Sequence, residues 1–358
     1  LIAIFLGTGL FADAFFVAFR LPNTFRRLFA EGTFNAAFIP SYAGELAQNK
    51  EKADEFARGV FNLLFIILLF IVLLAEIFMP QLIYLIAPGF YLDPEKFNFA
   101  TNLSRITFPF LFFISLASFF AAILNSHNKF AISAAAPIIL NIVLIGSLFI
   151  SYWLNMTEVI TLSYAVSLAG LLQLLILFFF VRKNFKPILT FKINIDYKIK
   201  FFFKKLIPSI FSSGVTQINI LVGTIIASFQ AGAVSYLYYA DRVYQINLAI
   251  AGIAIGTVML PQLSNYVKNN NEKEVLNLQN RSIELSLFLS IPAAVALFLA
   301  SKEIVTSLFG YGSFDIESVN NTAIALTFFA LGVPAFSILK ILSNLFFARN
   351  NTKLPFYL

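Results

Sequence analysis

Long apolar segments alternate with short polar ones along the whole chain. Nine of these segments approach or exceed the roughly 20 residues that a helix needs to cross the hydrocarbon layer of a membrane. They lie at residues 10–43, 59–88, 104–125, 130–153, 159–181, 203–229, 233–264, 283–300 and 322–347. Prolines fall within or beside most of them, and in membrane helices proline produces a kink without ending the helix. The pattern predicts an all-α polytopic membrane protein.

The composition excludes several classes of protein. Of the 358 residues, 59% are hydrophobic, 12% are charged and 45 are Phe, which is far from the composition of a soluble domain. The chain has no Cys and one His, so disulfides, thiol catalysis and metal sites built from Cys or clustered His are excluded. Phosphate loops and nucleophile elbows are also absent from the sequence. We therefore expect no catalytic residues, no metal ligands and no cofactor.

The distribution of Lys and Arg among the loops predicts the orientation in the membrane. One set of alternating loops, which includes the tract 182–205, holds 17 of the 25 bases, whereas the opposite set holds Lys96, Arg105 and Lys302. Loops rich in Lys and Arg remain in the cytoplasm, so we expect the first set to face it. The tract 182–205 alternates bases with aromatic residues, as a nucleic-acid-binding strand does. Its place between two halves of the chain favours an interfacial linker on anionic lipid instead.

Two matches between the halves of the chain predict an internal repeat. FADAFFVAFRLPN over SYLYYADRVYQIN pairs Arg20 with Arg242, and TFPFLFFISLASFFAAILNSHNK matches TFFALGVPAFSILKILSNLFFARNNTK at nearly the same offset. We expect two pseudosymmetric helical bundles, repeated in parallel, with a cavity between them. Residues 1–195 would form the N-lobe, with a basic interlobe linker from about 182, and residues 196–358 the C-lobe. The repeat also predicts a fragment that lacks most of the first helix and the C-terminal helices.

Five bases fall inside the predicted spans, where a charge needs either a partner or a function. They are Arg20, Arg26, Arg27, Arg242 and Lys340. Asp13, Arg20 and Arg27 recur every seven residues and would share one stripe of an unbroken helix, although Pro22 is expected to interrupt it. Lys340, the fifth base, is expected either to snorkel or to line the cavity. The polar residues of the whole constellation are Asp13, Arg20, Asn23, Arg26, Arg27, Glu31, Asp241 and Arg242.

Arginines outnumber acids four to three in this constellation, which favours an anionic ligand. A guanidinium donates two parallel hydrogen bonds to phosphate oxygens in a way that an ammonium does not. The residue types therefore indicate a phosphate or pyrophosphate in a water-filled cavity. The alternative is that these arginines reach the headgroups from helix ends or join the helices through ion pairs. His127, in a short cytoplasmic loop, is expected to be a solvated turn residue.

The motif ADAFFVAFRLPNTFRRLFAEGTFNAAFIP, followed in order by ITFPF, AAILN, YYADR and GTVMLPQLS, resembles the MurJ (MviN) lipid II flippases of bacteria. That family belongs to the MOP superfamily, whose members have a MATE-like fold of two six-helix lobes. The resemblance implies two further C-terminal helices and alternating access. It also implies transport of lipid II from the cytoplasmic to the outer leaflet of the inner membrane, for peptidoglycan synthesis, cell wall biogenesis and cell shape.

The resemblance also implies roles for individual residues and partners. Arg20, Asn23, Arg26, Arg27 and Arg242 would bind the substrate, with the arginines on its pyrophosphate. Asp13, Glu31 and Asp241 would form gates or ion pairs, although Gln245 departs from the acidic residue that the family leads us to expect there. The expected partners are lipid II and membrane lipids, with no nucleic acid, and the expected protein is a monomeric transporter rather than an enzyme.

Two alternatives remain open on the residues alone. An exporter of another polyprenyl-linked glycan or of a small molecule would share the fold. A membrane glycan polymerase would use the same lipid but would need an essential acid or base in an outward-facing loop. The acids available there are Asp93, Glu95, Asp315 and Glu317.

Overall fold

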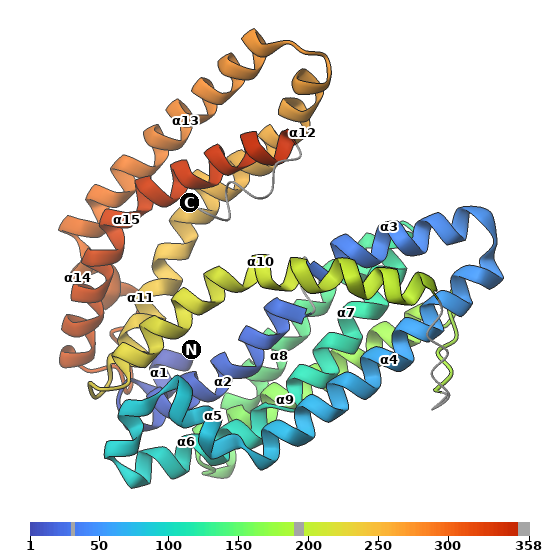
Figure 1. Cartoon of the computed structure of the whole chain (residues 1–358). Helices are drawn as coiled ribbons and strands as arrows, with labels where there is room; N and C mark the ends of the chain where they lie inside the picture. The colour runs from blue at the N-terminus through green and yellow to red at the C-terminus, as the bar shows by residue number, and fades with distance from the viewer. Residues whose placement is uncertain (30–32, 190–196, 350–358) are drawn as a thin grey trace. The chain divides into compact units, whose positions relative to one another are not determined.

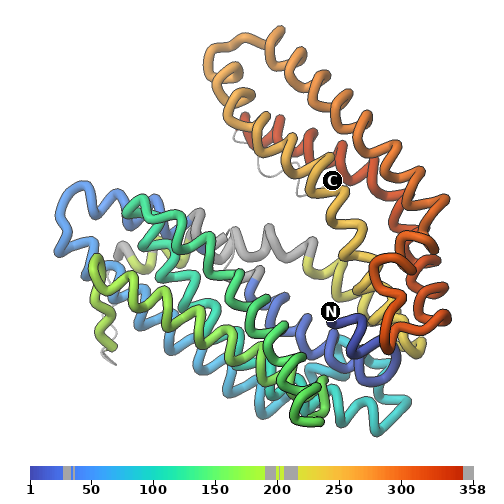
Figure 2. Tube along the Cα trace, turned by 180° about the vertical axis from the view of Figure 1, so that it is seen from behind, coloured from blue at the N-terminus to red at the C-terminus, as the bar shows by residue number. Residues whose placement is uncertain are grey.

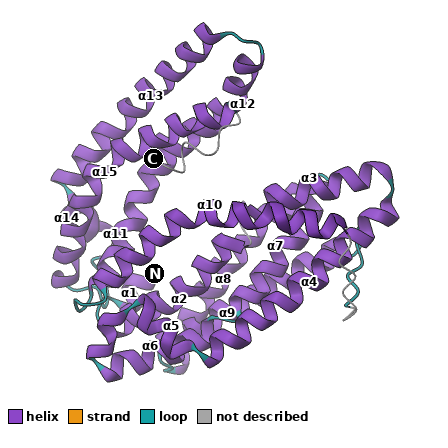
Figure 3. Cartoon of the chain, in the orientation of Figure 1, coloured by secondary structure: helices purple, strands orange, loops and turns teal. Residues whose placement is uncertain are grey.

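The computed structural model describes residues 1–29, 33–189 and 197–349, and within these ranges the regular structure is helical (Figures 1 and 3). The chain divides into two compact units. The first unit runs from Leu10 to Ala231 and includes Leu1, and the second consists of Ile2–Gly9 with the chain from Gly232 onward. The lobe boundary near residue 195 stays a prediction.

The first unit is a bundle in which α9 is covered by α7 and α8, and α2 packs along α6 (Figure 2). Its helices are α2 (Leu10–Phe29), α3 (Thr33–Gln48), α4 (Lys50–Ile77), α5 (Met79–Ile86), the 3₁₀ turn η1 (Pro88–Leu92), α6 (Pro94–Thr107), α7 (Phe110–Ser126), α8 (Phe130–Leu154), α9 (Glu158–Val181) and α10 (Tyr197–Ala227). Helix α10 also contacts α2, α3 and η1. The backbone of Gly89 in η1 approaches Ser228 so closely that a Cβ would lie 2.3 Å from the Ser228 carbonyl oxygen. A glycine is therefore required where η1 meets the end of α10.

The second unit is built around α15, which packs along α13 and α11. Its helices are α1 (Ile2–Leu6), α11 (Ala233–Leu248), the π-helical turn η2 (Ala249–Ala254), α12 (Ile255–Lys268), α13 (Glu272–Leu299), α14 (Ser301–Phe309) and α15 (Ile316–Ala348). Three hydrogen bonds among the described residues attach α1 and the turn after it to this unit. The Ser313 amide donates to the Ile4 carbonyl at 2.8 Å, and the Tyr239 hydroxyl donates to the Gly7 carbonyl at 3.1 Å. The Thr8 and Ser318 hydroxyl oxygens lie 2.5 Å apart. This segment therefore belongs structurally with residues more than 200 positions away.

Phenylalanine fills much of the interior of the first unit. Phe38 on α3 lies 5.1 Å from Phe119 on α7 and 6.1 Å from Phe202 on α10, measured between ring centroids. Phe34 packs on the same two rings, and all four side chains are buried. Aromatic pairs at these separations add specific edge-to-face attraction to the burial of apolar area. Helices α3, α7 and α10 are thus held together by interlocking rings.

Seven of the nine expected spans coincide with helices that are long and apolar enough to cross a membrane, counted within the described residues. The other two, 10–43 and 203–229, coincide with α2 followed by α3 and with α10. The prediction of an all-α multi-span membrane protein is confirmed.

The predicted ends of several spans were wrong. The span expected at 59–88 is two helices, because α4 ends at Ile77 and α5 begins at Met79 with Pro80 in its first turn. Other helices begin well before their apolar segments, at residues whose side chains accept hydrogen bonds from the first amides: Asn49, Asp93, Asn271 and Asp315. Hydropathy locates the part of a helix inside the bilayer, whereas capping side chains decide where the helix starts.

Candidate functional site

Helix α2 carries most of the predicted site residues, and it continues through Pro22 instead of breaking there. Proline has no amide hydrogen, so the carbonyl of Ala18, four residues earlier, loses its partner within the helix. The hydroxyl of Thr107, the last residue of α6, donates to this carbonyl at 2.8 Å. Because Thr107 is fully buried, no water is needed to satisfy the freed carbonyl. A side chain of the neighbouring helix α6 thus replaces the hydrogen bond that Pro22 cannot donate.

Asp13, in the first turn of α2, is completely buried and forms an ion pair with Lys96 on α6. The Asp13 Oδ2 atom lies 2.7 Å from Lys96 Nζ, which also lies 4.2 Å from the centroid of the Phe90 ring. Lys96 was predicted from the sequence to lie in an outer loop, but it is only 6% exposed. The one signal that pointed to Lys96 was its rarity, as one of three bases in the outer loops.

Arg20, Asn23 and Thr24 lie about two to three turns further along α2 than Asp13. The Arg20 guanidinium donates to the Thr224 hydroxyl on α10. Asn23 donates to the Phe19 carbonyl at 2.7 Å, and the Thr24 hydroxyl donates to the Arg20 carbonyl at 3.0 Å. Arg20 is therefore oriented by a second helix, while Asn23 and Thr24 fold back on their own helix.

The remaining predicted residues of this region are described to different degrees. Arg26 is partly buried near the end of α2. Arg27 lies on the described backbone of α2 but its side chain lies outside the described part of the structure, and so does the whole of Glu31. The expected pairing of Arg27 with Glu31 stays a prediction.

Asp241 and Arg242 lie together on α11 of the second unit. Gln245 donates to the Asp241 carboxylate at 2.5 Å, so the residue that departs from the expected acid contacts the neighbouring acid. The Arg242 guanidinium lies over the Tyr238 ring at 4.8 Å from its centroid, and the side chain is exposed. A guanidinium stacked on a ring keeps its N–H donors in its own plane, where they are available to an anion.

The chain after α11 contains a π-helical turn that the sequence did not indicate. Within η2 the Ala251 carbonyl accepts a hydrogen bond from the buried Ser286 hydroxyl of α13 at 2.7 Å. Just beyond it, Asn344 of α15 donates to the Gly256 carbonyl at 2.9 Å. Turns of this kind are rare and frequent at functional sites. Here two neighbouring helices supply donors to the widened turn.

His127 lies in the turn after α7, as the sequence predicted, but it is only partly solvated. It is half-buried, and the Tyr42 hydroxyl lies 3.3 Å from its Nε2 atom. Burial lowers the pKa of His127, and the charges of Lys129 and Lys50 lower it further, while Asp54 opposes them. The imidazole therefore favours its neutral form more strongly than an ordinary histidine does.

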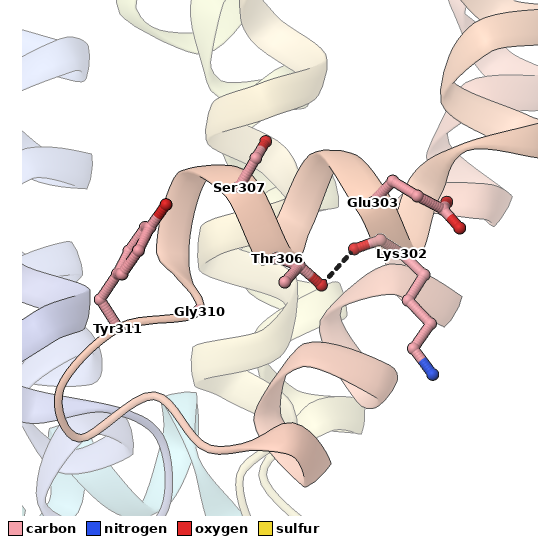
Figure 4. Close-up of a pocket in the computed structure, with 6 residues that line it drawn as sticks. All are labelled: Lys302, Glu303, Thr306, Ser307, Gly310 and Tyr311. Carbon is pink, nitrogen blue, oxygen red and sulfur yellow. Dashed lines mark hydrogen bonds between the residues drawn. The ribbon is translucent and has the colours of Figure 1, made fainter.

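Two hollows on the surface lie away from the predicted residues. A cavity of about 390 Å³ beside α14 is lined by Lys302, Glu303, Thr306, Ser307, Gly310 and Tyr311 (Figure 4). The Thr306 hydroxyl there is already bonded to the Lys302 carbonyl of its own helix. An apolar groove of similar volume runs between α8 and α9. Neither hollow is lined by a residue of the predicted constellation, so the candidate site residues remain the arginines of α2 in the first unit and Arg242 of α11 in the second.

Comparison with known proteins identifies the relatives of the chain. A family model described as lipid II flippase MurJ matches residues 2–358. A probable lipid II flippase MurJ of Rhizobium tropici is 43% identical over 360 residues, covering 99% of this chain and 68% of that protein. Its counterpart in Rickettsia prowazekii is 41% identical and is covered to 70%. The chain thus spans about two thirds of the length of these relatives.

Solved structures give the same result. A lipid II flippase MurJ in an inward closed conformation matches with a TM-score of 0.87 and 30% identity, over 99% of this chain and 73% of that one. An inward-facing MATE family multidrug transporter of the MOP superfamily matches with a TM-score of 0.73 at 15% identity, over 99% of this chain and 85% of that one, which shows a shared fold.

The resemblance of the motifs is therefore confirmed over the full length of the sequence. The family model covers all but the first residue, and the alignments with relatives more than 40% identical extend over 99% of the chain. The chain belongs to the lipid II flippase MurJ family.

Proposed function

We propose that this protein moves lipid II from the cytoplasmic to the outer leaflet by alternating access, with the arginines of α2 and α11 binding the pyrophosphate. The observation that carries the proposal is the helix α2, where Arg20 and Arg26 lie within a predicted span of a MurJ family member. Guanidinium groups inside a membrane protein are costly unless they serve a ligand or a partner, and pyrophosphate is the part of lipid II that they suit.

Membership of the family identifies the membrane in which the protein works and the kind of process it carries out. The chain is a multi-pass protein of the bacterial inner membrane, and it is a transporter rather than an enzyme. The substrate therefore needs to be bound and released on opposite sides, with no covalent bond made or broken. The polyprenyl tail stays in the bilayer, and the headgroup crosses in contact with polar side chains.

The described contacts support distinct roles for the arginines. The bond from Arg20 to Thr224 of α10 orients the guanidinium from a second helix of the same unit. The Arg242 guanidinium lies over the Tyr238 ring, and this contact helps to hold it in position. Arginines oriented by partners lose less side-chain entropy when they bind, which favours affinity for a bulky anionic headgroup.

The experiment that tests the proposal follows lipid II by leaflet. Cells are depleted of their native flippase and supplied with the full-length parent of this chain, or with its Arg26→Ala variant, and lipid II on the outer face is quantified. We expect outer lipid II with the parent and none above background with Arg26→Ala. Arg281→Ala, which removes an exposed arginine of α13, is the matched control and should behave as the parent.

Two results would contradict the proposal. If an inserted parent protein delivers no lipid II, the assignment of the substrate is wrong. If Arg26→Ala delivers as much as the parent, the arginine site does not carry the headgroup.

A further inference from the structure

Lys96 occupies an unusual position for a lysine that the sequence assigns to a loop. Its side chain passes over the Phe90 ring and ends 2.7 Å from the buried carboxylate of Asp13. Its backbone amide donates to the Asp93 carboxylate, which caps the start of α6. Both ends of the residue are thus fixed, and a lysine that is 6% exposed has given up most of its hydration to reach Asp13.

The pair is the first along α2 of three hydrogen-bonded contacts that the structure describes between α2 and neighbouring helices. One turn and a half further along, Thr107 of α6 donates to the Ala18 carbonyl, and then Arg20 donates to Thr224 of α10. The helix is therefore anchored on two sides just before the segment that carries Asn23 and Arg26. Among these contacts, the bond to Lys96 is the only one that joins two opposite charges.

The charge of Asp13 matters for the arginines on the same helix. Asp13 and Arg20 are seven residues apart, which places them about 10 Å apart along the axis of a helix. Paired with Lys96, the carboxylate is compensated locally. Without Lys96, its negative charge would act on the neighbouring guanidinium groups and repel an incoming anion, because electrostatic interactions are strong in a buried environment.

We propose that Lys96 is a positioning residue for substrate binding: through Asp13 it holds α2 and balances the charge of the one acid on that helix, so that the arginines of α2 keep their orientation and their net attraction for the pyrophosphate. This role rests on the proposed function.

The test is a double-mutant cycle on the purified full-length protein, with the dissociation constant for lipid II and the number of binding sites measured together. Lys96→Met keeps the length of the side chain and removes its charge. We expect it to raise the dissociation constant about tenfold or more at an unchanged number of sites, since breaking a buried charge pair leaves one charge uncompensated. The double variant Lys96→Met with Asp13→Asn removes both charges and should bind lipid II more tightly than Lys96→Met alone, because it leaves no single uncompensated charge of the pair.

The matched control is the exposed ion pair between Arg349 and Glu272, which has an N–O distance of 2.6 Å. Arg349→Met also removes the positive partner of a base–acid pair, but this pair is exposed. It should leave lipid II binding unchanged because exposed pairs contribute little.

Three other outcomes would overturn the proposal in different ways. A loss of binding sites at an unchanged dissociation constant in Lys96→Met would make Lys96 a residue of folding only. A double variant as weak as the single one would show that Lys96 does not act through Asp13. Absence of lipid II binding by the unaltered protein would overturn the proposed function itself, and this role with it.

Discussion

At the scale of single residues, the feature that matters most is the type of cation. The site residues that the family resemblance assigns to the pyrophosphate include four arginines, and Arg242 shows why lysine would not serve in their place. Its guanidinium lies over the Tyr238 ring, and a planar group with several donors can keep this contact while it binds an anion, which a compact ammonium on a flexible stem does less well. Charge alone would be kept by lysine, whereas the planar fork and the stacking would be lost.

Arg242→Lys is therefore expected to weaken lipid II binding about tenfold while the net charge stays the same, because a bidentate bond is replaced by a point charge. The measurement is the dissociation constant of the purified full-length protein. Arg281→Lys makes the same exchange on the exposed surface of α13 and should change nothing. Equal affinity of both variants would mean that Arg242 acts through charge only.

At the scale of elements, helix α2 depends on its neighbour to pass through a proline. Pro22 removes the hydrogen bond to the Ala18 carbonyl, and the buried Thr107 hydroxyl replaces it. Of the polar side chains predicted for the site, Asn23 and Arg26 lie beyond this point, so their placement relies on the helix continuing in register.

Thr107→Val, which has the same shape but no hydroxyl, should destabilise the protein by about 1 to 3 kcal/mol, because the Ala18 carbonyl then stays buried without a donor. Thermal unfolding in detergent measures this loss. In a Pro22→Ala background the helix regains its own donor, and the same substitution should cost much less. Thr161→Val, at a partly exposed threonine bonded to the Thr157 carbonyl, is the control. An equal cost of Thr107→Val in both backgrounds would contradict this account of the kink.

The same helix shows what the sequence predicted and what it did not. Apolar segments long enough to cross a membrane are a local property, so the spans were predicted in number and approximate place, although several of their ends were not. The ion pair of Asp13 with Lys96 joins residues 83 positions apart, and the donor for Ala18 comes from α6. Such contacts depend on which helices pack together, and spacing along one chain does not contain that information.

The turn η2 and His127 also show that the sequence alone does not reveal contacts between distant helices. The π-helical turn η2 is stabilised by Ser286 and followed by a bond from Asn344, donors supplied by α13 and α15, and its own apolar sequence reads as an ordinary helix. His127 was predicted to be solvated because its loop is polar, but Tyr42 of α3 reaches it. In both cases a helix distant in sequence decides the environment of the residue.

At the scale of the whole molecule, the distribution of bases predicts the orientation of the chain in the membrane. Loops that contain most of the Lys and Arg residues alternate with loops that contain almost none. The turn between α12 and α13 belongs to the first set, and the turn between α8 and α9 to the second. Because basic loops resist translocation, we expect the first to face the cytoplasm and the second the periplasm. This orientation would also place Lys96 and Asp13 toward the outer end of α2.

The orientation can be measured with single cysteines, since this chain has none of its own. Met156→Cys and Asn269→Cys introduce one exposed thiol in each turn, with any cysteine elsewhere in the full-length parent replaced by serine. A maleimide that does not cross membranes should label Met156→Cys in intact spheroplasts and label Asn269→Cys only after the membrane is permeabilised. The reverse labelling would invert the orientation, and the arginines would then have to receive lipid II from the opposite side. Labelling of both turns in intact spheroplasts would mean that the bases do not determine a single topology in this protein.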